Sequence, residues 1–309
     1  MLYEYALIPD VFDPGAYTVA AFADKLPHYL KETLLNDSLV RDLRDGGWSA
    51  YCMAESSNLS RLGKEIIRKL ANSNRLRPFA AALPEIPEAA SDWCNEAIQS
   101  HQISALTGIT SAHATKSRFR QLEVASIEDL TGCPWWRGRS SSLTLDRKTT
   151  DYLKCLERLS SHARHLMFID PFLDPSQTQY REFHRLLSPL AGRTPSPLIE
   201  LHRKCYVDDG GRRSVLTTKE WQAQFQPLSQ QLSLIGLKAT VFLWSDFHDR
   251  FLISNLVGIS VPHGFDVSTR PNDLTPWTRL GKLDRARWQL EFDEAGAGLR
   301  LIGKFEIGA

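Results

Sequence analysis

Cysteine is scarce in this chain of 309 residues, and its five cysteines include no C-x-x-C pair. An odd number of scattered cysteines fits neither a disulfide framework nor a structural zinc site. We therefore expect no metal, no cofactor, and a reducing, cytoplasmic compartment. The cysteines are Cys52, Cys94, Cys133, Cys155 and Cys205.

Long apolar runs and an excess of charge are also lacking. No stretch reaches the roughly 18 apolar residues that a membrane span needs. The first residues, Met1–Tyr5, do not open a basic segment followed by an apolar core, so we expect no signal peptide. Lys and Arg total 37 against 36 Asp and Glu, a net charge of +1. Such a balance neither favours nor excludes a nucleic-acid partner, because binding depends on where charges cluster.

The N-terminal half is predicted to be mainly helical. Apolar residues recur at helical spacing over 16–35 and 58–71, and a further helix is expected over 88–100. Residues 3–8 read as a short strand, one of about three in this half. We expect residues 1–140 to form a mainly helical α/β domain that recognises a substrate or docks a protein partner.

The second half alternates helices with apolar strands. Residues 131–146 look like an irregular connection, in which Trp135 and Trp136 are expected to pack against the rest of the protein. Helices flanking apolar strands predict a layered α/β domain with a mixed sheet over 145–309. The expected helices are 148–161, 177–190 and 218–234, and the expected strands are 164–170, 197–206, 237–244, 250–254, 287–293 and 298–305.

The run from His248 to Asn255, His-Asp-Arg-Phe-Leu-Ile-Ser-Asn, carries the clearest chemistry. On a strand, His248 and Arg250 would face the same side. A histidine can attack phosphorus and form a covalent intermediate. A guanidinium can hold two phosphate oxygens by parallel hydrogen bonds. Asn255 follows as the apolar run ends.

These residues resemble the phospholipase D superfamily, whose motif is His-x-Lys followed after four residues by Asp. The histidine matches at His248, whereas Arg250 replaces the lysine and Asn255 replaces the aspartate. Residues 169–173, Ile-Asp-Pro-Phe-Leu, are similar to the "IDPYL" run of many such domains. Residues 264–268 lie where the family has a glycine-led turn that closes the phosphate pocket. The likeness covers about half of the chain and also extends to a non-catalytic, lipid-binding branch.

The resemblance implies a phospholipase D-like layered α-β-α domain and a metal-independent phosphodiesterase that works through a phosphohistidine. Active members use two histidines, and this chain has one such motif, so a homodimer that pairs two His248 side chains is implied. With a basic stretch after the motif, we expect a nuclease. The implied catalytic residues are His248, Arg250 and Asn255, and the implied substrate-binding residues are Asp170, Gly264, Asp266, Ser268 and Arg270.

Two alternatives come from the departures at Arg250 and Asn255. The chain could be a catalytically silent module that holds a phosphate of nucleic acid or of a lipid headgroup. It could also be a subunit of a bacterial defence complex, with residues 1–140 as the docking surface.

Several features have competing interpretations. Arg203 and Lys204 on a predicted strand could line a nucleic-acid groove, but a solvated face is the commoner explanation. The basic residues of 269–287 hint at a phosphate-backbone partner. Asp10 and Asp13 follow the first strand, where some metal-dependent nucleases begin. Helix capping and surface charge are the ordinary explanation, since nothing selects Glu55, Glu65, Asp92 or Asp129 as further ligands.

Overall fold

The computed structural model describes residues 1–209, 212–296 and 298–309, and the chain divides into two compact units. The N-terminal unit is Leu2–Ser140, and the C-terminal unit is Ser141–Ala309 with Met1. The division lies inside the connection expected over 131–146. That connection is more regular than expected, because it contains helix α6 (Pro134–Arg137) and the start of strand β6 (Ser142–Asp146).

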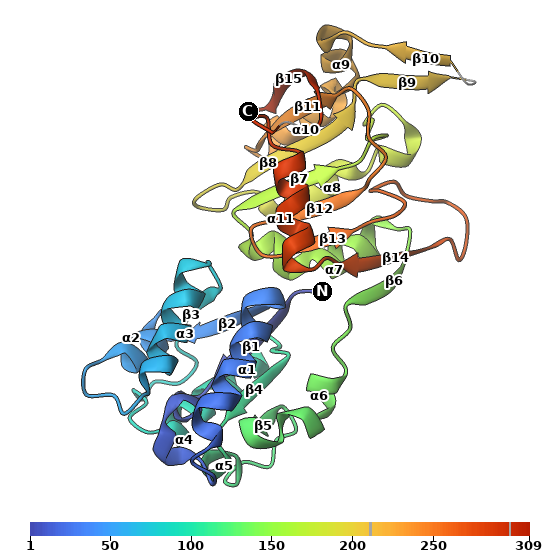
Figure 1. The fold of residues 1–309 in the computed structure, drawn as a ribbon. Helices are drawn as coiled ribbons and strands as arrows, with labels where there is room; N and C mark the ends of the chain where they lie inside the picture. The colour runs from blue at the N-terminus through green and yellow to red at the C-terminus, as the bar shows by residue number, and fades with distance from the viewer. Residues whose placement is uncertain (210–211, 297) are drawn as a thin grey trace. The chain divides into compact units, whose positions relative to one another are not determined.

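The N-terminal unit is built on a parallel sheet of five strands, in the order β3-β2-β1-β4-β5 (Figure 1). Its strands are β1 (Tyr3–Leu7), β2 (Ser38–Leu43), β3 (Leu76–Phe79), β4 (Gly108–Ser111) and β5 (Val124–Ser126). Its helices besides α6 are α1 (Phe22–Asp37), α2 (Gly47–Met53), α3 (Arg61–Asn72), α4 (Ala90–Ile103) and α5 (His113–Lys116). More residues of this unit are in helices than in strands, as predicted, but the expected number of about three strands was too low.

Buried polar residues explain why the sequence pattern did not predict all strands of this sheet. A central parallel strand is normally an apolar run, yet β2 buries Arg41 and Asp42. Arg41 pairs with the buried carboxylate of Glu4 at 2.9 Å, and its guanidinium lies 4.2 Å from the Phe79 ring. These partners come from β1 and β3, so the ion pair becomes acceptable only after the sheet has assembled.

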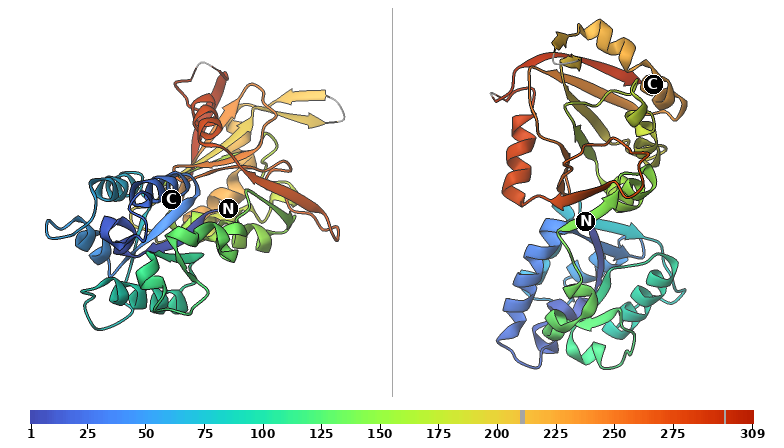
Figure 2. Two further views of the ribbon diagram at one scale, coloured as in Figure 1. Left: turned by 60° about the horizontal axis from the view of Figure 1, so that its bottom comes forward. Right: turned by 90° about the vertical axis from the view of Figure 1, so that its right-hand side faces the viewer.

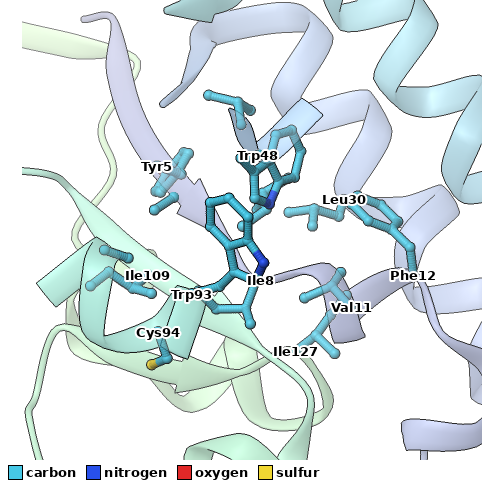
Figure 3. Close-up of a cluster of buried hydrophobic side chains, with 14 of the residues drawn as sticks. Tyr5, Ile8, Val11, Phe12, Leu30, Trp48, Trp93, Cys94, Ile109 and Ile127 are labelled. Carbon is cyan, nitrogen blue, oxygen red and sulfur yellow. The ribbon is translucent and has the colours of Figure 1, made fainter. Parts of the chain in front are cut away.

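The core of this unit forms between the sheet and its helices. Figure 3 shows Trp48 of α2 and Trp93 of α4 converging on Ile8 and Ile109, which come from the two central strands or their ends. Trp136 is buried, and Trp135 packs on Gly108, where a Cβ would overlap the indole. The expectation that the tryptophan pair packs against the protein is confirmed.

The C-terminal unit contains a mixed sheet of eight strands, in the order β15-β11-β8-β7-β12-β13-β14-β6. Strands β7, β8 and β11 run parallel, and the other neighbouring pairs are antiparallel. Besides β6, the strands are β7 (His165–Ile169), β8 (Leu198–Lys204), β11 (Lys238–Trp244), β12 (Phe251–Ser254), β13 (Gly258–Ser260), β14 (Leu274–Arg279) and β15 (Leu301–Gly308). A separate antiparallel ribbon pairs β9 (Tyr206–Asp209) with β10 (Arg212–Val215).

Helices cover both faces of this sheet. They are α7 (Thr149–His162), α8 (Phe183–Leu187), α9 (Thr218–Gln224), α10 (Gln226–Leu234) and α11 (Lys282–Glu291). Along β7 the side chains alternate: Phe168 meets Phe183 of α8, whereas Met167 and Ile169 join the cluster that includes Trp288 of α11. Figure 2 (right) shows α11 on the opposite side of the sheet from α8 and α10. The predicted mixed α/β class is confirmed at this level.

One predicted element has the wrong type. Residues 287–293 were expected to be a strand, but α11 extends to Glu291. Trp288 and Phe292 are four residues apart, and both pack on the sheet, while Leu290 between them is exposed. The alternation that suggested a strand therefore belongs to a helix with one covered face.

Candidate phosphate site at the carboxyl edge of the sheet

Asp170 directly follows β7 and is fully buried. Its Oδ1 accepts a hydrogen bond from the Phe172 amide at 3.0 Å, and its Oδ2 accepts from the Tyr180 hydroxyl at 2.9 Å and the Phe265 amide at 3.1 Å. Burial raises the pKa of this carboxyl, and the opposing effect of the hydrogen bonds and of Arg250 is smaller. One side chain thus fixes the turn after β7 and the distant turn at Phe265.

Gly264 completes this arrangement. Its φ of +69° lies in the left-handed region, and a Cβ at this position would overlap the Asp170 carboxylate. The structure therefore brings Asp170 and Gly264 together, as the resemblance implied. Their packing closes the turn around a carboxylate.

Two basic residues at the end of β8 are buried. Arg203 lies 3.3 Å from the Trp221 ring and donates to the carbonyl oxygens of Leu173, Lys204 and Tyr206. The Lys204 ammonium lies 4.0 Å from the Phe172 ring centroid and 4.3 Å from that of Tyr206. The interpretation of this pair as a solvated face was wrong.

His248 and Arg250 lie in the segment between β11 and β12, and Arg250, expected as the first residue of a strand, directly precedes β12. His248 is exposed, and its carbonyl oxygen accepts from Arg250 at 3.4 Å. Arg250 Nε lies 3.8 Å from Asp170 Oδ1, and the guanidinium carbon is 4.9 Å from the Phe172 ring centroid. Arg250 therefore meets the end of β7, because β12 runs antiparallel beside β7.

Asp246 connects His248 to the other cations. It accepts from the Tyr206 hydroxyl at 2.5 Å and from Arg213 at 3.1 Å. The Tyr206 hydrogen bond and the charges of Arg213 and His248 outweigh desolvation and hold the pKa of Asp246 below its usual range. We call this group the edge cluster, and it consists of Asp170, Phe172, Lys204, Tyr206, Arg213, Asp246, His248 and Arg250.

Asn255 is not part of the edge cluster. Its Oδ1 accepts from the amides of Arg164 and His165, which precede β7 or begin it. Strand β12 lies between Arg250 and Asn255, and five residues of extended chain span roughly 16 Å. The assignment of Asn255 as catalytic is therefore corrected: this side chain caps the opposite end of the sheet.

The remaining residues of the glycine-led turn are held by Arg147, which the sequence did not single out. Arg147 pairs with Asp266 at 2.6 Å and with Asp273 at 3.0 Å. The Ser268 amide donates to the Arg147 carbonyl, and the Ser268 hydroxyl accepts from the Arg270 amide. These contacts show that Asp266 and Ser268 hold the loop, and their role in substrate binding stays a prediction. Arg270 is exposed, and its role in substrate binding stays a prediction.

Arg285 of the basic stretch after the motif lies away from the edge cluster. Arg285 donates to the carbonyl oxygens of Asn255 and Leu256, at the end of β12 opposite to Arg250. The cations of the edge cluster come instead from β8, from the β9–β10 ribbon and from the segment before β12. The sequence does contain a sign of these cations. Basic or aromatic residues stand near the ends of the predicted strands at Ile169, Lys204 and Trp244, and ligands bind at the carboxyl ends of strands in such sheets.

The N-terminal unit has a carboxylate, Asp10, at a position where sheets of this kind commonly bind ligands. Asp10 follows β1, where the strand order reverses between β1 and β4, the usual position of ligands in such sheets. It is buried, its Oδ1 accepts from the Ala112 amide at 3.1 Å, and burial raises its pKa. Across residues 1–209, 212–296 and 298–309, no group of three or more His, Cys, Asp or Glu side chains could hold a metal ion. The carboxylate alternative thus finds no set of ligands in that part of the chain.

Comparisons with known proteins add little to this geometry. No protein-family model matches the chain, and neither does any curated protein. A solved structure of TrmBL2, an archaeal chromatin protein with a novel mode of DNA binding, is similar over 78% of this chain and 82% of that one. The identity is 10% and the TM-score is 0.27, which is too low to support an argument. In the described residues, no helix is both long and apolar enough to cross a membrane.

Proposed function

We propose that this protein is a metal-independent phosphodiesterase that cleaves nucleic acid at the edge cluster. The proposal is supported by three features of one edge of the sheet. Exposed His248 lies two residues from Arg250, which donates to its carbonyl oxygen, and Arg213 pairs with Asp246 of the same segment. Arg250 and the buried Lys204 both lie over the Phe172 ring. Cations grouped around a nucleophile match the needs of a phosphodiester, whose charge must be balanced while phosphorus is attacked.

In the proposed reaction, an imidazole nitrogen of His248 bonds to phosphorus as the bond from phosphorus to the leaving ester oxygen breaks. The leaving oxygen takes a proton, and water then attacks the phosphohistidine, releasing the phosphate monoester and free histidine. Arg250 binds the non-bridging oxygens, and Asp170 positions its guanidinium. Arginine does not release its proton at neutral pH, so the acid must be another group.

A second copy of the chain supplies that acid in our proposal. The chain has one His-x-Arg motif, and a two-fold axis would bring His248 of each copy to one phosphate. Mixing chains of His248→Ala with chains of Arg250→Ala tests this arrangement. If each composite site needs two histidines, such mixing restores no cleavage, and an excess of His248→Ala chains exchanged into wild-type dimers lowers wild-type activity. A monomeric site would leave wild-type activity unchanged by the added variant and independent of protein concentration.

The experiment that tests the chemistry is cleavage in EDTA by wild type and His248→Ala. The proposal expects wild-type cleavage to persist and the variant to lose at least about 100-fold in rate while keeping its affinity. Cleavage that EDTA abolishes would contradict it.

A silent phosphate-binding module is the second candidate. It is favoured by the position of Arg250, whose guanidinium is already engaged by Asp170 and Phe172 and is suited to binding rather than to proton transfer. In that case Arg250→Ala lowers affinity for phosphate ligands, and no variant or wild type cleaves them.

A further inference from the structure

Phe172 differs from the other exposed aromatic side chains of the described residues. Its side chain is 40% exposed, similar to Phe22 at 41%. Tyr29 and Tyr51 are also exposed, and each ring packs against a neighbouring tryptophan ring. Phe172 alone among the four has cations against its ring, namely Lys204 at 4.0 Å and Arg250 at 4.9 Å.

The ring is also held in place. The Phe172 amide donates to the buried Asp170 carboxylate, and Lys204 fills the space between the rings of Phe172 and Tyr206. A fixed ring loses little conformational entropy when a ligand covers it. Exposure of such a ring beside Arg250, the proposed phosphate-binding cation, therefore favours a ligand with both a flat apolar part and a phosphate.

We propose that Phe172 is a stacking platform for an unpaired nucleobase and that the substrate of the edge cluster is single-stranded nucleic acid. A base is available for stacking on a side chain when it is unstacked, as in single strands and loops. A lipid headgroup offers the phosphate and no aromatic base. This inference rests on the proposed function, because the neighbouring cations bind the phosphate of the same strand.

The test compares two labelled oligonucleotides of equal length, an oligothymidylate and a fully abasic strand, by fluorescence anisotropy with full-length protein. Stacking of one base on an aromatic side chain contributes about 1–3 kcal/mol, so Phe172→Leu should weaken oligothymidylate binding about 5- to 150-fold. Binding of the abasic strand should stay within about twofold. Phe172→Trp should retain the preference, and Phe22→Leu is the matched control.

The outcomes separate the two proposals. If Phe172→Leu weakens both strands equally, or if wild type binds duplex as tightly as single strands, the stacking platform is wrong while the phosphate site stands. If wild type binds neither strand, both proposals fail. Binding to vesicles of anionic phospholipid that Arg250→Ala abolishes, without binding to oligonucleotides, would assign the edge cluster to lipid instead.

Discussion

Replacing Asp170 with alanine should destabilise the C-terminal unit more than any other single change at the edge cluster. The substitution leaves three donors without their acceptor: the buried Phe265 amide and Tyr180 hydroxyl and the partly buried Phe172 amide. An unsatisfied buried donor costs about 1–3 kcal/mol, and release of a desolvated carboxyl offsets part of the total. We expect a loss of about 3 kcal/mol in the free energy of unfolding of the unit. Tyr180→Phe, which removes one of the three bonds, should cost about 1 kcal/mol.

The same carboxyl gives the loss a pH dependence of known sign. Burial raises the pKa of Asp170 above its ordinary value of 3.8. A carboxyl with a raised pKa binds its proton more tightly in the folded protein, so its contribution to stability is complete below the unfolded value. The contribution is lost as pH rises through the folded pKa. The gap between wild type and Asp170→Ala should therefore be wider at about pH 3.5 than at about pH 8.

Urea unfolding monitored by tryptophan fluorescence measures the global effect, and amide hydrogen exchange measures the local one. Faster exchange is expected in peptides that contain Phe172 and Phe265. A loss below about 1 kcal/mol, or unchanged protection of both amides, would refute the assignment of Asp170 as the residue that joins the two turns.

Three further predictions follow from particular contacts. Gly264→Ala should cost about 2–4 kcal/mol in the free energy of unfolding, because it adds an overlap with Asp170 to the strain of a positive φ. Gly192→Ala is the control for the strain alone, since Gly192 has a φ of +70° and no neighbour within 4 Å. Equal losses for the two variants in urea unfolding would count against the overlap. Asn255→Ala should lower the free energy of unfolding by about 1–2 kcal/mol, because the Arg164 and His165 amides lose their acceptor, and it should leave turnover unchanged. Lost turnover in a folded variant would return Asn255 to the catalytic group. Arg250→Ala should weaken phosphate-ligand binding about tenfold or more, with Arg120→Ala as the control at an exposed arginine of the N-terminal unit. Equal effects of the two variants in titrations of an oligonucleotide would disprove a special role for Arg250.

The central strands of the C-terminal unit could be predicted because their sequences are apolar runs between helices. Strands β7, β8, β11 and β12 all lie within predicted ranges. Strands β6 and β14 were missed, since they pair at the far edge of the sheet, where short, partly exposed strands leave a weak pattern. Whether the fold has phospholipase D-like layering stays a prediction.

The site could be predicted where chemistry depends on neighbouring residues in the sequence. His248 and Arg250 were identified from one motif, and Asp170 was identified from its position at the end of a predicted strand. Tyr206 and Arg213 could not be identified, because they join the cluster through Asp246, about 40 and 33 positions away in sequence. Asn255 was placed wrongly, because four residues of strand β12 carry it to the other end of the sheet.

The most direct test of the central claim is cleavage of single-stranded DNA and RNA in excess EDTA, comparing wild type with His248→Ala and with Asn255→Ala. Our account predicts that wild type and Asn255→Ala cleave at similar rates and that His248→Ala does not cleave. It also predicts a phosphohistidine that is trapped when the wild-type reaction is quenched with alkali and is lost when it is quenched with acid. Cleavage by His248→Ala at the wild-type rate would contradict the account.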